Sequence, residues 1–283
     1  MRARFLAVFL MWPLAGCPKP MVLRPYPAPP PGELLSQIRA NQQRVQSVKL
    51  YGKADVPDDS GGRVKLNIAV AVQRPSRLRL SADSTLAGPL LTLATDGQRY
   101  QLLDTQNNRF MSSVVTPCSM ARLLRVTLPP TMLADVLSGG VPLLTGDSIA
   151  IESDWDSSEG GREVLKLRDE TGRRQVLYLQ AQKPGPALPN SFDVVQSELI
   201  GTNGSPFLRI RHQGFDEVVP SPPIRLPKQS QIEDLVGKSQ VKLRWKESEV
   251  NPTLPAELFS LEQPAGLPND PDPCVGSAPA TQP

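Results

Sequence analysis

The sequence is poor in the residues that most enzymes use for chemistry. Its 283 residues include one histidine and three cysteines. These residues show no zinc-site spacing, and the chain has neither a G-x-S-x-G nucleophile elbow nor a phosphate-binding glycine loop. The histidine, His212, lies in the alternating stretch LRIRHQG, where we expect a surface side chain. The sequence therefore predicts a protein without enzymatic activity, metal or cofactor.

Excess charge, aromatic residues and long apolar runs are also scarce. Aromatic residues make up 5% of the chain. Of the 31 Lys and Arg residues, Arg2 and Arg4 precede Cys17, so 29 remain against 28 Asp and Glu beyond it. A chain so close to neutrality has no electrostatic reason to bind nucleic acid. The apolar run at residues 5–14 would measure about 15 Å as a helix, too short to span a hydrocarbon core of about 30 Å.

The N-terminus has the pattern of a bacterial lipoprotein signal. Two arginines precede the apolar run, which ends in Leu14-Ala15-Gly16-Cys17. A basic start, a short apolar run and small residues are typical of a secretory signal peptide. The ending is similar to the lipobox, in which the cysteine sulfur receives diacylglycerol and the preceding peptide is removed. We therefore expect a signal peptide at residues 1–16 and a lipid anchor on Cys17; the alternative is an ordinary signal peptide.

Proline is abundant, with 31 residues, and it gathers at the two ends of the chain. Residues 18–31 read PKPMVLRPYPAPPP, and residues 264–283 are similarly rich in proline. Such segments favour extended or disordered chain. We expect a semi-rigid tether at residues 17–31, in which residues 18–31 would measure about 43 Å at ~3.1 Å per residue. A folded domain should follow at residues 32–263, and a disordered tail at residues 264–283.

Between these ends the pattern is mainly that of β-strands. Residues 32–47 have helical periodicity, whereas residues 48–56, 63–72 and 77–82 alternate between apolar and polar side chains. Residues 119–139 predict a pair of short helices. Further strands are expected near residues 90–95, 98–104, 109–115, 147–153, 162–169, 173–181, 193–198, 206–215 and 239–246. We expect a curled antiparallel sheet of about eleven strands with a helical cover, and periodicity leaves open whether the interior is hollow or packed.

Several motifs resemble the LolA/LolB superfamily over residues 33–263. They are a P-x-R-L-R-L strand at residues 75–80, a hairpin with Asp96-Gly97, and the helix ADVLSGG at residues 134–140. The resemblance implies an incomplete barrel whose helical lid covers an apolar cavity for acyl chains. It is closest to LolB, which implies a monomeric outer-membrane lipoprotein facing the periplasm. Such a protein accepts lipoproteins from a LolA-like carrier and inserts them into the membrane.

Alternatives to this function remain open, among them a hydrolase with a scattered acidic site, and the choice of membrane is open as well. The same fold can serve as an envelope scaffold or as a lipid-sensing lipoprotein without transfer activity. Pro18 follows the expected lipidated cysteine, so the aspartate associated with inner-membrane retention in enterobacterial lipoproteins is missing. We therefore expect the outer membrane.

The alternating pattern and the resemblance together indicate which residues could contact the membrane or line the cavity. Leu86, in the loop ADSTLAGP, matches the protruding leucine with which LolB delivers its cargo; the alternative is a core residue. The apolar positions of the first strands and of the short helices are candidates to line the cavity: Leu50, Leu66, Ile68, Val70, Leu78, Leu80, Leu123, Leu133 and Leu137.

Cys118 and Cys274 remain once Cys17 is assigned to lipidation. An envelope location permits disulfides. We expect these two residues to pair, and the alternative is two unpaired thiols.

Overall fold

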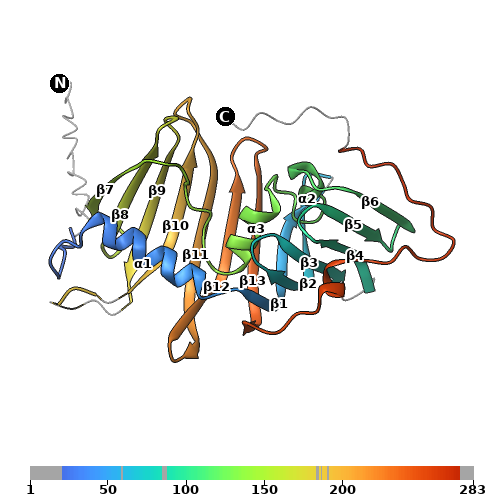
Figure 1. Cartoon of the computed structure of the whole chain (residues 1–283), viewed down its shortest axis with the longest axis horizontal. Helices are drawn as coiled ribbons and strands as arrows, with labels where there is room; N and C mark the ends of the chain where they lie inside the picture. The colour runs from blue at the N-terminus through green and yellow to red at the C-terminus, as the bar shows by residue number, and fades with distance from the viewer. Residues whose placement is uncertain are drawn as a thin grey trace, which may run out of the picture.

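The computed structural model describes residues 21–274 apart from residues 59, 85–87, 183, 184, 186 and 190, and it leaves the side chains of Pro117 and Leu123 undescribed. Cys17 and Leu86 therefore lie outside the described residues. The described chain forms one antiparallel sheet of 13 strands in the order β6-β5-β4-β3-β2-β1-β13-β12-β11-β10-β9-β8-β7 (Figure 1). The sheet is curled and open, with β6 and β7 at its two edges.

The strand bounds follow the predicted segments closely, except at one strand. They are β1 (Ser47–Pro57), β2 (Arg63–Gln73), β3 (Arg77–Ser84), β4 (Gly88–Thr95), β5 (Arg99–Asp104), β6 (Arg109–Val114), β7 (Ile149–Asp156), β8 (Arg162–Asp169), β9 (Arg174–Ala181), β10 (Phe192–Ile200), β11 (Pro206–Pro220), β12 (Pro223–Asp234) and β13 (Ser239–Val250).

The sequence patterns missed β12. Its segment contains Pro223 and Pro227, and proline has no N–H for a central ladder. The structure resolves this conflict because the pairing of β12 with β13 starts only at Gln229. Before that residue, β12 pairs with β11 alone, so Pro227 lies opposite Phe215 in a long two-stranded hairpin.

The helices lie across one face of the sheet (Figure 1). α1 (Pro31–Gln43) contacts β7, β8 and β10, and α3 (Pro130–Leu137) contacts β2 and β3. α2 (Pro117–Leu124) starts with a capping box in which the side chains of Thr116 and Ser119 each accept from the other's backbone N–H. None of the helices in the described part of the chain has the length and hydropathy that a membrane span requires.

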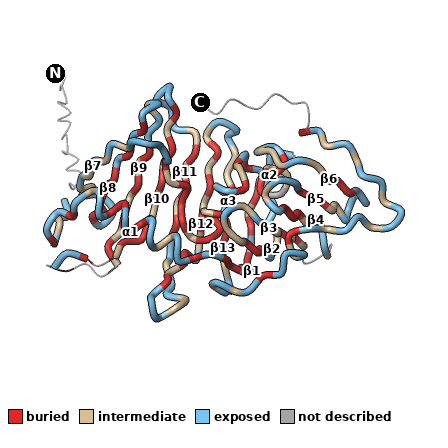
Figure 2. Tube along the Cα trace, viewed as in Figure 1, coloured by how far each residue is buried: buried red, intermediate tan, exposed pale blue. Residues whose placement is uncertain are grey.

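The predicted alternation decides which face of the sheet is buried. In β1, Val48, Leu50, Ala54 and Val56 are buried. Figure 2 shows buried positions along the central strands of the sheet. The apolar side chains of the helices and of this sheet face form one continuous hydrophobic cluster. On the opposite face, the short helix η1 (Ala256–Phe259) packs Phe259 against Ala71 in a second, small cluster.

The chain before α1 lies against the domain, which corrects the predicted tether. The Val22 N–H donates to the Ser157 carbonyl oxygen at 3.3 Å. Tyr26 is buried in edge contacts with the rings of Trp155 and Phe192. Aromatic burial of this kind outweighs the proline preference for free extended chain, so the folded domain starts near residue 22.

The predicted disordered tail is likewise packed as far as residue 274. Cys118 and Cys274 form a disulfide across a sequence separation of 156. Asn269 forms a parallel bridge with Phe110 of β6, and the Asp270 N–H donates to the Phe110 carbonyl oxygen at 2.8 Å. This segment therefore covers part of the β6 edge, whose backbone groups would otherwise be open to another strand.

Candidate functional site

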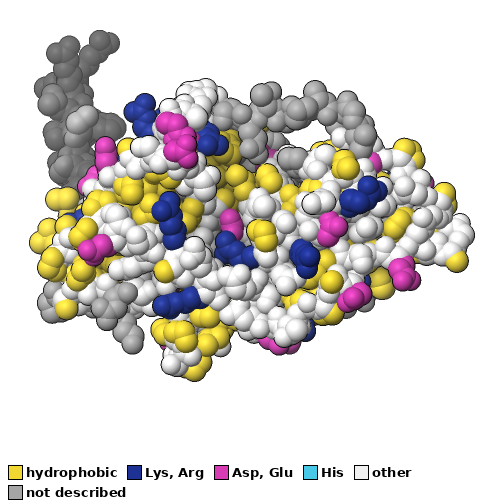
Figure 3. Space-filling model, in the orientation of Figure 1, with side chains coloured by type: hydrophobic (Ala, Val, Ile, Leu, Met, Phe, Trp, Pro, Cys, Tyr) yellow, Lys and Arg dark blue, Asp and Glu magenta, His cyan; other side chains and the backbone are white. Residues whose placement is uncertain are grey.

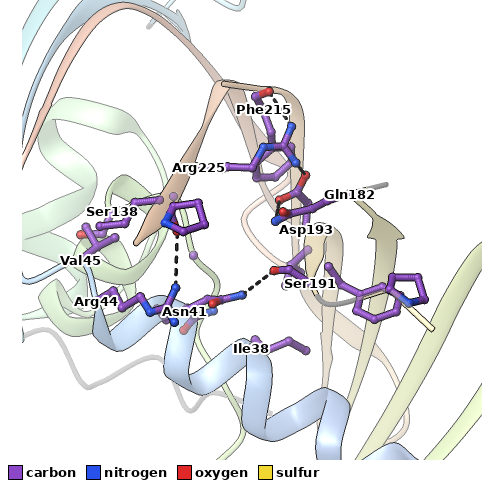
Figure 4. Close-up of a pocket in the computed structure, with 18 of the residues that line it drawn as sticks. Ile38, Asn41, Arg44, Val45, Ser138, Gln182, Ser191, Asp193, Phe215 and Arg225 are labelled. Atoms are coloured by element: carbon purple, nitrogen blue, oxygen red, sulfur yellow. Dashed lines mark hydrogen bonds and ion pairs between the residues drawn. The ribbon is translucent and has the colours of Figure 1, made fainter. Parts of the chain in front are cut away.

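A pocket of about 600 Å³ lies on the helix-covered face, at the C-terminal end of α1 (Figure 4). Its walls come from α1, from the turn after α3, from the segment between β9 and β10, and from the β11–β12 hairpin. Pockets of 300–1,000 Å³ are typical of sites for single small ligands.

The inner wall of the pocket is apolar. Ile38 comes from α1 and Val45 from the turn that follows it. Phe192 and Val194 come from β10, and Ile224 comes from β12. All five side chains are at most 9% exposed, so they form a fixed surface without hydrogen-bonding groups. Such a wall can hold hydrocarbon but offers no chemistry.

Polar side chains stand around the mouth. Asn41 Nδ2 donates to Ser191 Oγ at 3.2 Å and so joins the end of α1 to the start of β10. Arg44 is exposed, and its Nη1 donates to the Pro223 carbonyl oxygen at 3.5 Å. Among the described lining residues, Leu188, on the segment before β10, is the large hydrophobic side chain that is exposed, at 39%. The mouth is therefore amphipathic.

A charged cluster closes one side of the pocket (Figure 4). Arg225 forms an ion pair with Asp193 and donates through Nη2 to the Phe215 carbonyl oxygen at 2.9 Å. Gln182 Nε2 donates to the other Asp193 oxygen at 2.9 Å. Burial raises the pKa of Asp193, and the Arg225 guanidinium opposes that rise. Because all the groups are paired, the cluster serves to hold β10 and β12 together.

Arg74 links α1 and α3 beside the pocket. It forms an ion pair with Asp135 of α3, and its Nη1 donates to the Gln42 carbonyl oxygen at 3.0 Å, at the end of α1. A guanidinium is favourable at a helix C-terminus because the helix dipole is negative there. Burial raises the pKa of Asp135 to about 6, although the Arg74 charge lowers it.

His212 is buried in the sheet, which corrects the expectation of a surface side chain. Its Nε2 lies 2.8 Å from the Gly140 carbonyl oxygen, and its Nδ1 lies 2.9 Å from Ser230 Oγ. Since a carbonyl only accepts, Nε2 carries the proton and Nδ1 accepts from the Ser230 hydroxyl. Burial lowers the pKa of His212 to about 4, against the opposing effect of the Gly140 hydrogen bond. The neutral ring is a structural link between β11 and the turn after α3.

The predicted cavity-lining residues lie on the predicted face but not around the pocket. Ile68, Val70, Leu78 and Leu80 are nearly fully buried in the core, together with Leu50, Leu133 and Leu137. Leu66 is partly buried against the same core, and the side chain of Leu123 is not described. None of these residues lines the pocket. In this part of the core α3 contacts β2 and β3, whereas the pocket is lined from α1, β10 and β12.

The pocket residues carry no motif that the sequence analysis could have used. Phe192 and Val194 alternate as in many strands, and Asn41 resembles any polar residue near a helix end. Ile224 and Arg225 fall in the strand that was missed. Within the described residues, no group of three or more His, Cys, Asp or Glu side chains is arranged to hold a metal ion.

The sequence itself matches no model of a protein family, and no curated protein matches it. Solved structures do match. A LolA superfamily protein from Nitrosomonas europaea superposes with a TM-score of 0.50 at 12% identity, covering 81% of this chain and 97% of the other. A DUF1329 family protein from Desulfovibrio piger superposes with a TM-score of 0.51 at 9% identity, covering 79% and 97%.

Identities this low establish the fold alone. The open, curled antiparallel sheet with helices across one face is the arrangement that these structures share with this chain. The structural neighbours thus support the LolA part of the predicted resemblance, while LolB itself stays a prediction. This chain has a LolA-like fold.

Proposed function

We propose that this protein is a lipid-anchored envelope lipoprotein that binds an acyl chain in the pocket at the end of α1. The observation that carries the proposal is the pocket's buried apolar wall, which opens through an amphipathic mouth. Each methylene group moved from water into such a wall contributes about 0.8 kcal/mol. The polar rim would then face the head of the lipid or lipoprotein.

Native mass spectrometry of the purified chain tests this binding, together with displacement of a fluorescent fatty acid. We expect co-purified acyl lipid in the wild type. Leu188→Glu places a charge at the exposed mouth and should weaken fatty-acid binding about tenfold or more, because hydrocarbon must then pass a carboxylate. Val236→Glu changes a side chain that is 65% exposed in the β12–β13 turn, away from the pocket, and serves as the matched control. Equal affinities in the two variants would contradict the assignment of the pocket.

The anchor is Cys17, as its lipobox indicates. The Cys17→Ser chain should keep residues 1–16, lack the mass of the lipid and lose the lipid anchor. Unchanged mass and membrane fractionation in this variant would refute lipidation.

The finer proposal is LolB-like transfer at the outer membrane, from a LolA-like carrier. It is supported by the LolA-like fold and by the position of Leu86 in the sequence. Leu86→Glu should preserve stability and fatty-acid binding while blocking delivery of a lipoprotein from carrier to vesicles. A strong fall in melting temperature would instead identify Leu86 as a core residue, and unchanged delivery would show that Leu86 has no part in transfer. A wild-type chain that delivers no lipoprotein would favour a lipid-binding protein without transfer activity.

A further inference from the structure

The segment before α1 has two different sides. Val22, Arg24 and Tyr26 turn toward the domain, and the residues between them turn outward. Met21 is 81% exposed and Leu23 is 83% exposed, the highest values among the large hydrophobic side chains described. The exposed side is apolar throughout residues 21–28 and consists of Met21, Leu23, Pro25, Pro27 and Ala28. A segment that faces only water has no reason to carry such a side.

Backbone hydrogen bonds of Val22 attach the inward side of this segment to the domain. Its N–H donates to the Ser157 carbonyl oxygen at 3.3 Å, and its own carbonyl accepts from Trp155 Nε1 at 2.8 Å. Gly161 leaves room for this contact, since a Cβ there would lie 2.5 Å from the Trp155 ring and 3.0 Å from Val22 Cγ1. The β7–β8 hairpin is therefore shaped to receive the segment.

A buried ion pair fixes the segment two residues later. Arg24 Nε lies 2.9 Å from Glu163 Oε1, and Arg24 Nη2 donates to Glu163 Oε2 at 3.0 Å. The Glu163 side chain is fully buried, and the Arg24 guanidinium also lies over the Trp155 ring, 5.3 Å from its centre. Without Arg24 this carboxylate would be an unpaired charge in the interior. The outward side therefore has one fixed orientation relative to the domain.

The chain length limits how far this side can lie from the lipid. Cys17 and Met21 are four residues apart, which is at most about 14 Å of extended chain. The polar layer of a bilayer is about 5–8 Å deep on each side of the hydrocarbon. This step rests on the proposed function, in which Cys17 carries the anchor. Met21 and Leu23 then lie within reach of the bilayer that holds that anchor.

We propose that the outward side of residues 21–28 is a membrane-contact face, which rests in the interface of the bilayer that carries the Cys17 lipid. The domain then lies with its β7–β8 edge on the membrane instead of standing off on a long tether. Hydrophobic side chains gather at this end of the molecule, at the left of Figure 3. Because the face is apolar and Arg24 is paired, the contact does not depend on anionic lipid.

The segment that carries the membrane-contact face packs against a residue of the pocket wall. Tyr26 lies with its ring centre 6.2 Å from that of Phe192, and Phe192 lines the pocket wall. One aromatic cluster thus separates the docked segment from the bound acyl chain.

Tryptophan quenching in vesicles tests this orientation on the full, lipidated chain. The processed chain has two tryptophans, Trp155 and Trp245, because Trp12 precedes Cys17. Trp155 touches the docked segment, whereas Trp245 lies on β13, six strands and about 29 Å away along the sheet. The vesicles contain phosphatidylethanolamine, phosphatidylglycerol and a phosphatidylcholine with a nitroxide near its headgroup. The Trp245→Phe chain retains Trp155 as its one tryptophan, so its fluorescence measures the quenching of Trp155. The Trp155→Phe chain measures the quenching of Trp245 in the same way.

We expect several-fold stronger quenching of Trp155 than of Trp245, at low and at high salt alike. Adding Met21→Glu and Leu23→Glu to the Trp245→Phe chain should reduce the quenching of Trp155; both side chains are exposed, so folding is unaffected. Equal quenching of the two tryptophans in a chain that floats with the vesicles overturns the membrane-contact face alone. A chain that does not float overturns the anchor on Cys17, and this orientation with it.

Discussion

Gly52 of β1 lies directly against Arg244 of β13. A Cβ on Gly52 would be 2.1 Å from the Arg244 carbonyl oxygen. The pairing moves from Tyr51–Glu247 to Gly52–Trp245 at this point, so β13 carries one extra residue and bulges toward β1. This contact lies at the seam where the strands from the start of the chain meet those from its end.

Gly52→Ala should therefore destabilise the protein by about 3 kcal/mol or more, because the backbone of β13 must move to admit the methyl group. Urea denaturation measures the change in the free energy of unfolding. Gly32→Ala is the matched control, since Gly32 lies in α1 with no atom within 4 Å of the added Cβ. It should stabilise the protein by roughly 0.5 kcal/mol. Similar effects of the two substitutions would contradict the close approach at the seam.

Replacing either disulfide cysteine should release the C-terminal segment. For the loop closed by Cys118 and Cys274, the chain-entropy model gives a loss of up to about 5 kcal/mol. Cys118→Ser and Cys274→Ser should have equal effects in urea denaturation, and a reducing agent should change neither variant further. Limited proteolysis should cut near residue 270 in both variants before it cuts the wild type. Wild-type stability in either variant would show that the disulfide does not constrain the chain.

His212 should make the protein sensitive to mild acid. Its folded pKa of about 4 lies below the unfolded value of 6.5, so the unfolded chain binds the proton first as the pH falls. The stabilisation by the neutral ring is complete above pH 6.5 and is lost as the pH falls to 4, a difference of about 3 kcal/mol.

The free energy of unfolding should thus fall by about 3 kcal/mol more in the wild type than in His212→Gln over this pH range, because glutamine does not titrate. The comparison is needed because Asp135, with its raised pKa, changes stability in the opposite direction. Parallel pH profiles of the two proteins would show that His212 is not buried in its neutral form.

The two faces of β2 should differ sharply in their tolerance of charge. Val70 is 3% exposed in the core, whereas its neighbour Ala69 is exposed on the opposite face. Val70→Asp should cost about 4 kcal/mol or more, because it buries a carboxylate without a partner. Ala69→Asp should change the free energy of unfolding by less than about 1 kcal/mol. Comparable losses would contradict the assigned faces.

Much of the fold could be predicted because the pattern of a strand is local. Alternation in β1 and β2 places Val48, Leu50 and Val70 on one face whatever strands lie beside them. β12 escaped prediction because a proline is compatible with a strand only where one neighbour is missing, and only the register with β13 shows where that is. The candidate site could not be predicted from local patterns either, because its walls come from elements that are far apart in the chain.

The sequence by itself determined the buried face of the sheet and the helix positions, because each depends on neighbouring residues, and on the same local basis it predicts a lipobox. Tertiary structure alone decided that residues 22–29 are docked, that His212 is buried and that the hollow lies over β10 and β12. These outcomes depend on partners that are distant in sequence: Arg24 and Glu163 are 139 positions apart, and His212 and Gly140 are 72 apart. No local pattern records whether a distant carboxylate or carbonyl will be there to pair with.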